Sequence, residues 1–335
     1  SDALYFNPAG LARVPGFNLT IVDPAVGVSG LEAFESIQKL QDEAEFSDAV
    51  RELYGESVWA HAGAKSAFTT RYFGVAVYNN LDASLQVNNP VSSEIDVLAV
   101  NDFGYLMGVA ASPLPIWDIG MVLKYIQRTG SDVPLDSSFV GSLDPDSLLD
   151  NIRNKGDGYG LDIGSNLVVP VTPILETTFS AVWRDVGTTT FRSEPGGDAP
   201  PAQDSEIVLG SSAVFDLALM QLSAALDFRY LNRTDLELGQ KLNFGVELSL
   251  PLLDARAGFH QGYYTLGAGV NLGLVRVDAA TYGQELGEYP GQKEDRRYML
   301  QATIELGFDP SFDFIGGGSG GGRARSPSKR LKQRR

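Results

Sequence analysis

The segment 297–308 alternates strictly between apolar and polar side chains, and it constrains the fold more than any other stretch of the chain. Its odd positions include Arg297 and Glu305. Its even positions are all apolar: Tyr298, Leu300, Ala302, Ile304, Leu306 and Phe308. A period of two predicts a β-strand with one apolar face. About twelve residues at ~3.3 Å each, tilted by about 40°, cross a bilayer core of about 25–30 Å. We therefore interpret this segment as the closing strand of an outer-membrane β-barrel.

The same alternation recurs in 175–184, 221–230 and 241–250. Over these segments and 297–308, the apolar phase holds 21 positions and no charge. The opposite 21 positions hold eight charged residues: Glu176, Arg184, Asp227, Arg229, Lys241, Glu247, Arg297 and Glu305. Lipid exposure explains the bias, because one Arg or Lys at mid-bilayer costs about 2–4 kcal/mol. A soluble β-sandwich with the same pattern turned inside out is the alternative.

The charged phase predicts a polar network in the lumen of the barrel. We expect it to contain Asp227, Arg229, Glu247, Arg297 and Glu305, with Asp227 and Arg229 as mutual partners. Glycine and other small residues share this phase, which suits a crowded interior.

The fold class predicted is all-β: a transmembrane antiparallel β-barrel of about 14 strands, with short extracellular and N-terminal helices. Tight linkers at 172–173, 219–220 and 251–253 alternate with long polar ones at 131–157, 191–204 and 287–294, as in outer-membrane barrels. The candidate strands are 18–29, 57–67, 72–88, 94–112, 116–130, 158–171, 174–190, 205–218, 221–232, 240–250, 254–261, 263–272, 275–286 and 295–308.

Two stretches depart from the strand pattern. Residues 31–54 place apolar side chains at helical spacing, and we expect a solvated helical excursion outside the barrel. Asp144 is a candidate N-cap and Pro145 suits the first turn of a helix, so the sequence predicts a loop helix over about 144–153.

Composition excludes several classes of protein. The chain has 335 residues and no cysteine, so it has neither a disulfide framework nor a thiolate metal site. It contains no run of 18 apolar residues and no secretory leader pattern at its start, so we expect a processed or trimmed chain if it is exported.

Charge is unevenly spread along the chain. Residues 316–335 hold seven basic residues and no acidic one, whereas the remainder has 19 basic against 42 acidic residues, a net charge of −23. Such an acidic body argues against nucleic acid as a partner. We expect residues 310–335 to be a disordered Gly/Ser linker and basic tail, either natural or appended.

The N-terminal residues 2–12, read as Asp-Ala-Leu-Tyr-Phe-Asn-Pro-Ala-Gly-Leu-Ala, resemble the plug motif of the FadL-type outer-membrane family. Residues 281–306 are similar to the C-terminal end of the same group. The resemblance implies a plug-like segment over 1–16, a barrel over 17–309 and fourteen strands. Members normally carry a stretch before this motif and end at their last strand, whereas this chain starts at Ser1 and continues beyond Phe308.

The resemblance implies an outer-membrane channel for passive uptake of hydrophobic small molecules such as long-chain fatty acids. The plug would be built by Phe6, Asn7, Pro8 and Ala9, with the Asn7 amide tying its backbone together. The expected partners are a hydrophobic small molecule and membrane lipids, and the expected location is the bacterial outer membrane.

A second hypothesis comes from PorV-like relatives, which act as shuttles or scaffolds. Loops 131–157 and 191–204 would then hold a protein partner, and the lumen would transport nothing.

An envelope enzyme is the third hypothesis, and the sequence offers no residues to carry it. His61 and His260 are the two histidines, and each lies in a strand pattern without a second ligand at metal spacing. We expect them to be structural or to line the lumen. No cofactor, metal or catalytic set is predicted, so we expect the chain not to be an enzyme.

Overall fold

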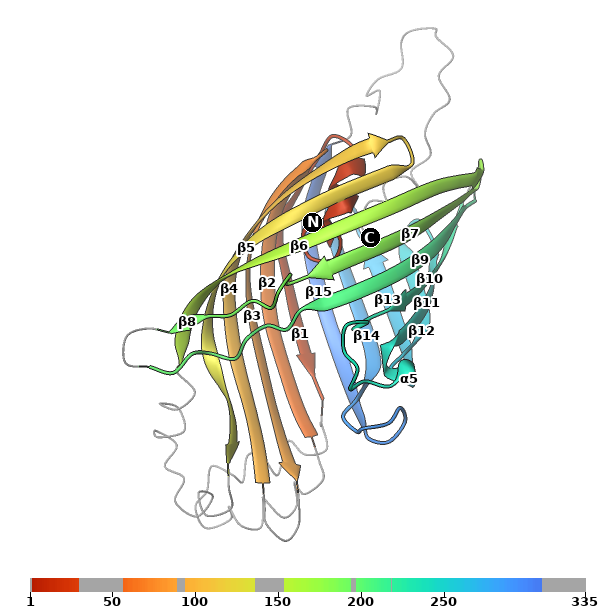
Figure 1. Cartoon of the computed structure of the whole chain (residues 1–335). Coiled ribbons are helices and arrows are strands. Elements are labelled where there is room, and N and C mark those ends of the chain that lie inside the picture. The colour runs from red at the N-terminus through yellow and green to blue at the C-terminus, as the bar shows by residue number, and fades with distance from the viewer. Residues whose placement is uncertain are drawn as a thin grey trace, which may run out of the picture.

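The computed structural model describes residues 2–29, 57–88, 94–135, 154–193, 197–217 and 219–308, which form a closed antiparallel barrel (Figure 1). Its wall consists of fourteen long strands. They are β1 (Phe17–Val28), β2 (Ser57–Thr70), β3 (Phe73–Asn88), β4 (Glu94–Leu114), β5 (Trp117–Leu135), β6 (Lys155–Thr172), β7 (Leu175–Arg184), β9 (Glu206–Asp216), β10 (Gln221–Phe228), β11 (Leu242–Ser249), β12 (Leu253–His260), β13 (Tyr263–Asn271), β14 (Val275–Glu285) and β15 (Glu294–Phe308).

Shorter elements accompany the wall. They are the 3-10 turns η1 (Asp2–Leu4) and η2 (Pro8–Arg13), the short strand β8 (Arg192–Ser193) and the helix α5 (Leu238–Lys241). None of the helices in the described ranges is long and apolar enough to cross a membrane.

Consecutive strands pair along the wall, and the pairing of β1 with β15 closes it. In this pairing Val26 lies opposite Leu300. Closure leaves no edge strand, so the backbone groups of the wall bond to one another. The register of β1 shifts between Thr20 and Asp23, and Pro24, which has no N–H to donate, follows this bulge.

All fourteen predicted strands are confirmed, with boundaries that shift by a few residues. The largest difference is β7, predicted over 174–190, which ends at Arg184 because Asp185 adopts a φ of 47° and turns the chain. The predicted helices at 31–54 and 144–153 and the predicted tail at 310–335 lie outside the described residues.

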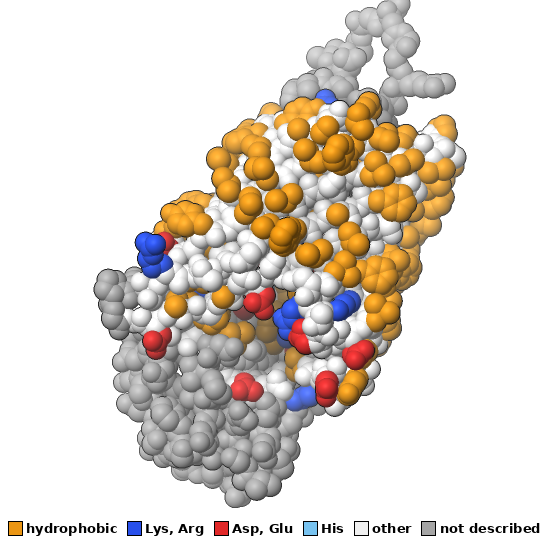
Figure 2. All heavy atoms as spheres, in the orientation of Figure 1, with side chains coloured by type: hydrophobic (Ala, Val, Ile, Leu, Met, Phe, Trp, Pro, Cys, Tyr) orange, Lys and Arg blue, Asp and Glu red, His pale blue; other side chains and the backbone are white. Residues whose placement is uncertain are grey.

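The apolar phase of the strands faces outward. Phe179 is 55% exposed, Leu300 51% and Phe244 46%, and Figure 2 shows hydrophobic side chains covering the upper part of the barrel. The charged phase faces the lumen, where Arg229 forms an ion pair with Glu206 at 2.7 Å. The soluble sandwich is therefore wrong, because its apolar side chains would be enclosed.

The two ends of the barrel differ. Six short turns, at 71–72, 115–116, 173–174, 217–220, 250–252 and 272–274, lie at the end where β1 begins and β15 finishes. We call this the turn end and the opposite end the loop end. The longer connections are at the loop end, although β12 and β13 meet there in a tight turn through Gln261 (φ 50°) and Gly262 (φ 102°).

The wall is much taller on one side than on the other, as Figure 1 shows. Strands β4, β5 and β6 have 21, 19 and 18 residues, whereas β10, β11 and β12 have 8 each. A transmembrane strand needs about 9–11 residues. The tall side therefore extends beyond a bilayer, and the strands of the short side fall just below the length of a full span.

Outward aromatic side chains mark a boundary toward the loop end. Tyr125 lies between its cross-strand partners Tyr105 and Tyr159, with ring centroids 6.4 and 5.2 Å away. On the other side of the barrel, Phe259 lies between Phe244 and Tyr264. Such girdles flank the apolar band of transmembrane barrels. We call these six residues the aromatic belt: Tyr105, Tyr125, Tyr159, Phe244, Phe259 and Tyr264.

The outward face predicts a depth-dependent cost of charge. We expect Ile304→Arg, near the middle of the apolar face of β15, to destabilise the barrel by about 2–4 kcal/mol in a bilayer. Tyr298→Arg, on the same face but close to the loop end, should cost only about 0–1 kcal/mol. Urea titration in phospholipid vesicles, followed by the gel shift of folded barrel, measures both. Equal costs would contradict the outward assignment of this face.

Candidate functional site

The N-terminal segment begins with local capping chemistry. Asn7 is the N-cap of η2, with an extended backbone, and its Oδ1 accepts a hydrogen bond from the Ala9 N–H at 3.1 Å. Pro8 follows at the first helical position, where its fixed φ suits the turn and its missing N–H costs nothing. The Asn-Pro-Ala motif therefore works as a helix start.

This segment lies inside the barrel near the turn end (Figure 1). Leu4 and Leu11 are fully buried and form a cluster with Leu106 of β4 and Val122 of β5. At about 25 cal/mol per Å² of buried apolar surface, this contact stabilises the segment against one side of the wall.

Glycines in the wall make room for the segment. A Cβ at Gly120 would lie 2.5 Å from the Pro8 carbonyl oxygen and 2.7 Å from the Ala9 nitrogen. Gly164, the cross-strand partner of Gly120, lies 2.9 Å from Pro8 by the same measure. A Cβ at Gly108 would lie 2.5 Å from the Leu4 side chain. Only glycine permits this close approach of two backbones.

Polar contacts fix the segment in place. The Asn7 Nδ2 donates to Asn166 Oδ1 of β6 at 2.7 Å. Arg13 forms an ion pair with the fully buried Asp118 of β5 and donates to the Pro115 carbonyl at 3.1 Å. The Asn7 amide thus joins the wall as well as its own turn.

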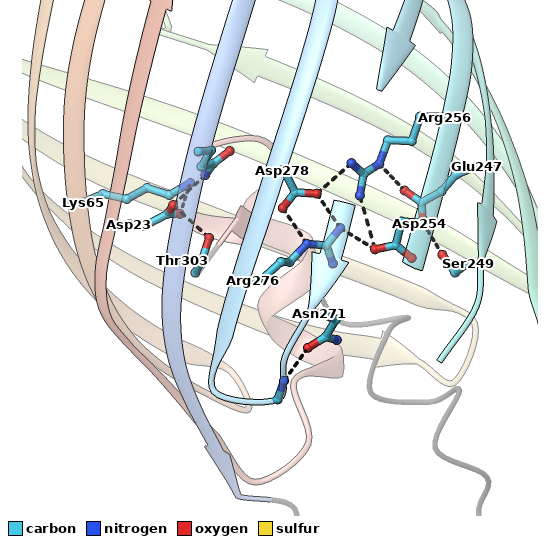
Figure 3. Close-up of polar contacts among 12 residues, drawn as sticks. Asp23, Lys65, Glu247, Ser249, Asp254, Arg256, Asn271, Arg276, Asp278 and Thr303 are labelled. Atoms are coloured by element: carbon cyan, nitrogen blue, oxygen red, sulfur yellow. Dashed lines mark hydrogen bonds and ion pairs between the residues drawn. The ribbon is translucent and has the colours of Figure 1, made fainter. Parts of the chain in front are cut away.

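Lys65 of β2 joins the segment to the bulge in β1. Its Nζ lies 3.2 Å from Asp2 and 3.3 Å from Asp23, which also accepts a hydrogen bond from Thr303 at 2.9 Å (Figure 3). The same Nζ lies 4.9 Å from the centre of the Tyr5 ring. Burial raises the pKa of the Tyr5 hydroxyl, and the nearby Asp23 and Asp2 raise it further, so this ring stays neutral.

Three of the four predicted plug residues contribute to the contact between the N-terminal segment and the wall. Pro8 and Ala9 are buried, and Asn7 supplies the cap. Phe6, in contrast, is 59% exposed. Its apolar ring is the least enclosed part of the segment.

The lumen beside the segment is lined by ion pairs. Lys124 of β5 contacts Asp162 at 2.7 Å and Asp185 at 2.6 Å, and its side chain is 7% exposed. Arg128 makes two parallel hydrogen bonds of 2.7 Å to Asp102 of β4. Burying these charges is tolerable because each has a partner.

A second cluster lies on the opposite wall (Figure 3). Arg256 of β12 contacts Glu247 and Asp278, each at 2.8 Å. Arg276 contacts Asp254 at 2.8 Å and Asp278 at 2.6 Å. The predicted lumen residue Glu247 therefore belongs to a five-residue cluster on β11, β12 and β14.

The direct ion pair of Arg229 is with Glu206, while Asp227 interacts with Arg229 at longer range. The Arg229 guanidinium donates to Glu206 of β9 at 2.7 Å. The Asp227 carboxylate instead lies over Gly210 of the same neighbouring strand. Residues two apart on one strand share a face, but cross-strand register brings Glu206 closer to the charged end of the long arginine side chain.

The other predicted lumen residues form separate contacts. Arg297 pairs with Asp295 at 2.8 Å and covers the Trp59 ring at 4.3 Å. Glu305 accepts a hydrogen bond from Asn18 of β1. The five predicted residues thus make several local sets of contacts.

Residues 185–193 and 197–205 fold back onto the wall. Asp185 accepts hydrogen bonds from Thr189 and Gln203, both at 2.8 Å. Arg128 donates to the Pro201 carbonyl at 2.7 Å and covers the Phe191 ring at 4.4 Å. The described part of the predicted partner loop 191–204 is therefore anchored to the barrel interior.

Both histidines face the lumen and have local partners. The His61 Nδ1 lies 2.9 Å from Asp82, and the ring stacks on Trp59. The His260 Nδ1 lies 2.5 Å from Asn243, and the ring packs edge-on against Tyr282. Within the described ranges, no group of three or more His, Asp or Glu side chains is arranged to hold a metal ion.

One pocket lies beside the N-terminal segment, and another lies at the wall. A polar pocket of about 520 Å³ lies beside Tyr5, and ion-pair residues such as Lys124, Asp185 and Arg229 line it. A shallow, open apolar pocket of about 580 Å³ lies at the wall of β13, β14, β15 and β1, and some of its lining side chains, such as Val26, Leu266 and Leu300, are exposed on the outward face. Its lining includes Val26, Gly27, Leu266, Ala280, Met299 and Leu300.

Sequence reasoning missed the apolar pocket, because its lining combines four strands and depends on their register. The sequence feature that could have indicated it is a set of small residues at positions that pair across neighbouring strands. Gly267 lies opposite Ala280, and Ala280 lies opposite Met299. Small side chains in consecutive strands leave space at the wall.

These features define a class: a transmembrane β-barrel of fourteen strands whose turn end contains an N-terminal segment. No protein-family model and no curated protein sequence matches the chain.

Solved structures do resemble it. The toluene transporter TodX of Pseudomonas putida is 11% identical, with 91% of this chain and 92% of that one covered and a TM-score of 0.46. The CymD monoaromatic hydrocarbon channel is 11% identical, with 92% of each chain covered and a TM-score of 0.47. The toluene transporter TbuX of Ralstonia pickettii is 12% identical, with 90% of this chain and 92% of that one covered and a TM-score of 0.45. The likeness concerns the fold.

The close approach of Gly120 to Pro8 and Ala9 predicts that a single methyl group at position 120 displaces the N-terminal segment. We expect Gly120→Ala to raise ion conductance across planar bilayers, because its Cβ would overlap the backbone of Pro8 and Ala9. Gly245→Ala is the matched control on β11, since a Cβ there meets nothing within 4 Å. Unchanged conductance in Gly120→Ala would mean that this contact does not restrict the lumen.

The N-cap of η2 predicts that the N-terminal segment becomes more mobile when the cap is removed. Asn7→Ala removes the cap and the bond to Asn166, which we expect to cost about 1 kcal/mol and to raise trypsin cleavage after Arg13 about fivefold. Asn166→Ala should give a smaller increase because the cap remains. The double variant should resemble Asn7→Ala alone, and full additivity would argue against the contact between the two amides.

Proposed function

We propose that the chain is a channel of the bacterial outer membrane for passive uptake of hydrophobic small molecules, such as long-chain fatty acids. The apolar pocket of about 580 Å³ at the wall of β13, β14, β15 and β1 is the observation that carries the proposal. Its volume falls within the range of about 300–1,000 Å³ for small-molecule sites. Burial of apolar ligand surface, at about 25 cal/mol per Å², would drive capture without an energy source.

The N-terminal segment acts as the plug in this proposal. It fills part of the turn end through Leu4 and Leu11 and restricts free aqueous flow. The polar pocket beside it carries paired charges, which make a poor path for a hydrocarbon because the ligand would displace water from polar groups. A hydrophobic ligand would therefore rest at the wall and leave past the plug or between strands.

One charged residue, Arg256, lines the apolar pocket. It is already bonded to Glu247 and Asp278. A fatty-acid carboxylate would compete for this guanidinium, whereas a neutral hydrocarbon would use the apolar lining alone. The comparison of these two ligand types therefore tests the fatty-acid part of the proposal separately from hydrophobic uptake in general.

Trp59 provides an internal reporter for the pocket. A Cβ at Gly27, a lining residue, would lie 2.7 Å from the Trp59 ring. In a background with Trp117→Phe and Trp183→Phe, emission from Trp59 should change saturably with micromolar fatty acid. Toluene should be titrated beside it. No saturable change with either ligand would contradict transport.

Filling the pocket predicts a loss of affinity. We expect Ala280→Phe to weaken ligand binding about tenfold or more, because the ring occupies the space that an acyl chain needs. Gly245→Phe places the same ring in the lumen on β11, away from the pocket, and should leave the affinity unchanged. Equal losses in both variants would show that the pocket is not the site.

A shuttle or scaffold function is the second candidate, and the tall wall favours it. Strands β4 and β5 continue about ten residues beyond Tyr105 and Tyr125, more than a membrane span requires. A partner would then contact this wall at the loop end. Absence of ligand binding at Trp59, together with a complex that is lost when the tall wall is shortened, would favour this function.

A further inference from the structure

The six turns at the turn end are strongly apolar. Five of them consist of apolar, Pro and Gly residues alone. Leu219 is 81% exposed, Leu272 68% and Leu252 63%. Single exposed leucines are common, but the same feature in successive turns forms a continuous apolar rim. We call the turns at 71–72, 115–116, 173–174, 217–220, 250–252 and 272–274 the turn rim.

Arg71 is the one charged residue in the turn rim, and it folds back onto the protein. Its Nε donates to the Ala12 carbonyl at 3.3 Å, and its guanidinium lies 4.9 Å from the centre of the Tyr72 ring. The loop end is different, since its connection at 229–237 carries the exposed ion pair of Arg233 and Asp235. The two ends therefore face different surroundings.

The height of the wall identifies those surroundings. From Tyr125 of the aromatic belt to Trp117 at the start of β5 there are eight residues, and from Tyr264 to Leu272 there are also eight. At ~3.3 Å per residue and a tilt of about 40°, this distance is about 20 Å along the membrane normal. The apolar band of such barrels is about 25 Å tall, and the belt marks one boundary. The other boundary then falls at or beyond the turn tips.

We propose that the turn rim lies in the acyl-chain region of the bilayer and contacts lipid, so that it forms the lower part of the lipid-facing band. The eight-residue strands β10, β11 and β12 are too short to fill the band alone, and Leu219, Leu252 and Leu272 complete it. Apart from Arg71, the described residues of the rim continue the outward apolar face, which makes lipid their occupant. The tall wall of β4, β5 and β6 then stands entirely on the loop side. This inference rests on the membrane location in the proposed function but not on transport.

Site-directed spin labelling tests the rim directly, because the chain has no native cysteine. Leu219→Cys, Leu252→Cys and Leu272→Cys carry the label in full-length protein folded into phosphatidylcholine vesicles. Ile304→Cys is the lipid reference, and Glu288→Cys, in the exposed connection before β15, is the water reference. We expect the rim labels to collide with oxygen and to be shielded from a water-soluble nickel complex, as at Ile304.

Two outcomes would overturn the proposal in different ways. Rim labels that collide with the nickel complex as Glu288 does, while Ile304 remains shielded, would place the turns in water. If added periplasmic protein then shielded them, the rim would be a protein-docking surface instead. Exposure of Ile304 itself would reject the membrane assignment and with it the proposed function. Failure of fatty-acid binding at Trp59 would leave the result for the rim unchanged.

A second measurement needs no label. The triple variant Leu219→Asn, Leu252→Asn and Leu272→Asn shortens the apolar band without touching a strand. We expect its folding yield to fall in thicker bilayers and to be retained in thinner ones, whereas the unmodified chain tolerates both. An identical dependence on thickness in the two proteins would contradict the proposal.

Discussion

The peptide groups in the membrane-spanning part of the wall lie in hydrocarbon, where they have no water to bond, and this constraint governs the rest of the structure. The pairing of β1 with β15 satisfies them by closing the sheet. Closure divides the side chains into an outward set that meets lipid and an inward set that meets the lumen. Within the apolar band, charge is confined to the second set, so the lumen must compensate it internally.

That compensation shapes the interior. Lys124 and Arg256 each have more than one carboxylate partner, and the clusters around them lie on opposite walls. The N-terminal segment lies against one side of the lumen, over Gly120 and Gly164, where small residues let its backbone approach. The apolar pocket lies on another part of the wall, away from most of the charges. The ion-paired lumen and the apolar pocket thus occupy separate places in one barrel.

Much of the fold was predictable from the sequence. Period-two alternation found the fourteen strands and their outward faces, because lipid excludes charge from every second position. The Asn7-Pro8-Ala9 motif predicted a helix start, since capping depends on neighbouring residues only. The site was less predictable. Arg229 reaches Glu206 on another strand, and the pocket around Ala280 needs four strands in register.

The sequence by itself determined which face of each strand meets lipid, where the chain turns, and that charge is kept inside. These properties depend on residues close together in the chain. Only the tertiary structure decided which charges pair, which side of the wall receives the N-terminal segment, and how the short wall of β10 to β12 differs from the tall wall of β4 to β6. Those properties depend on strand register and barrel closure, which join residues such as Asn18 and Glu305 from opposite ends of the chain.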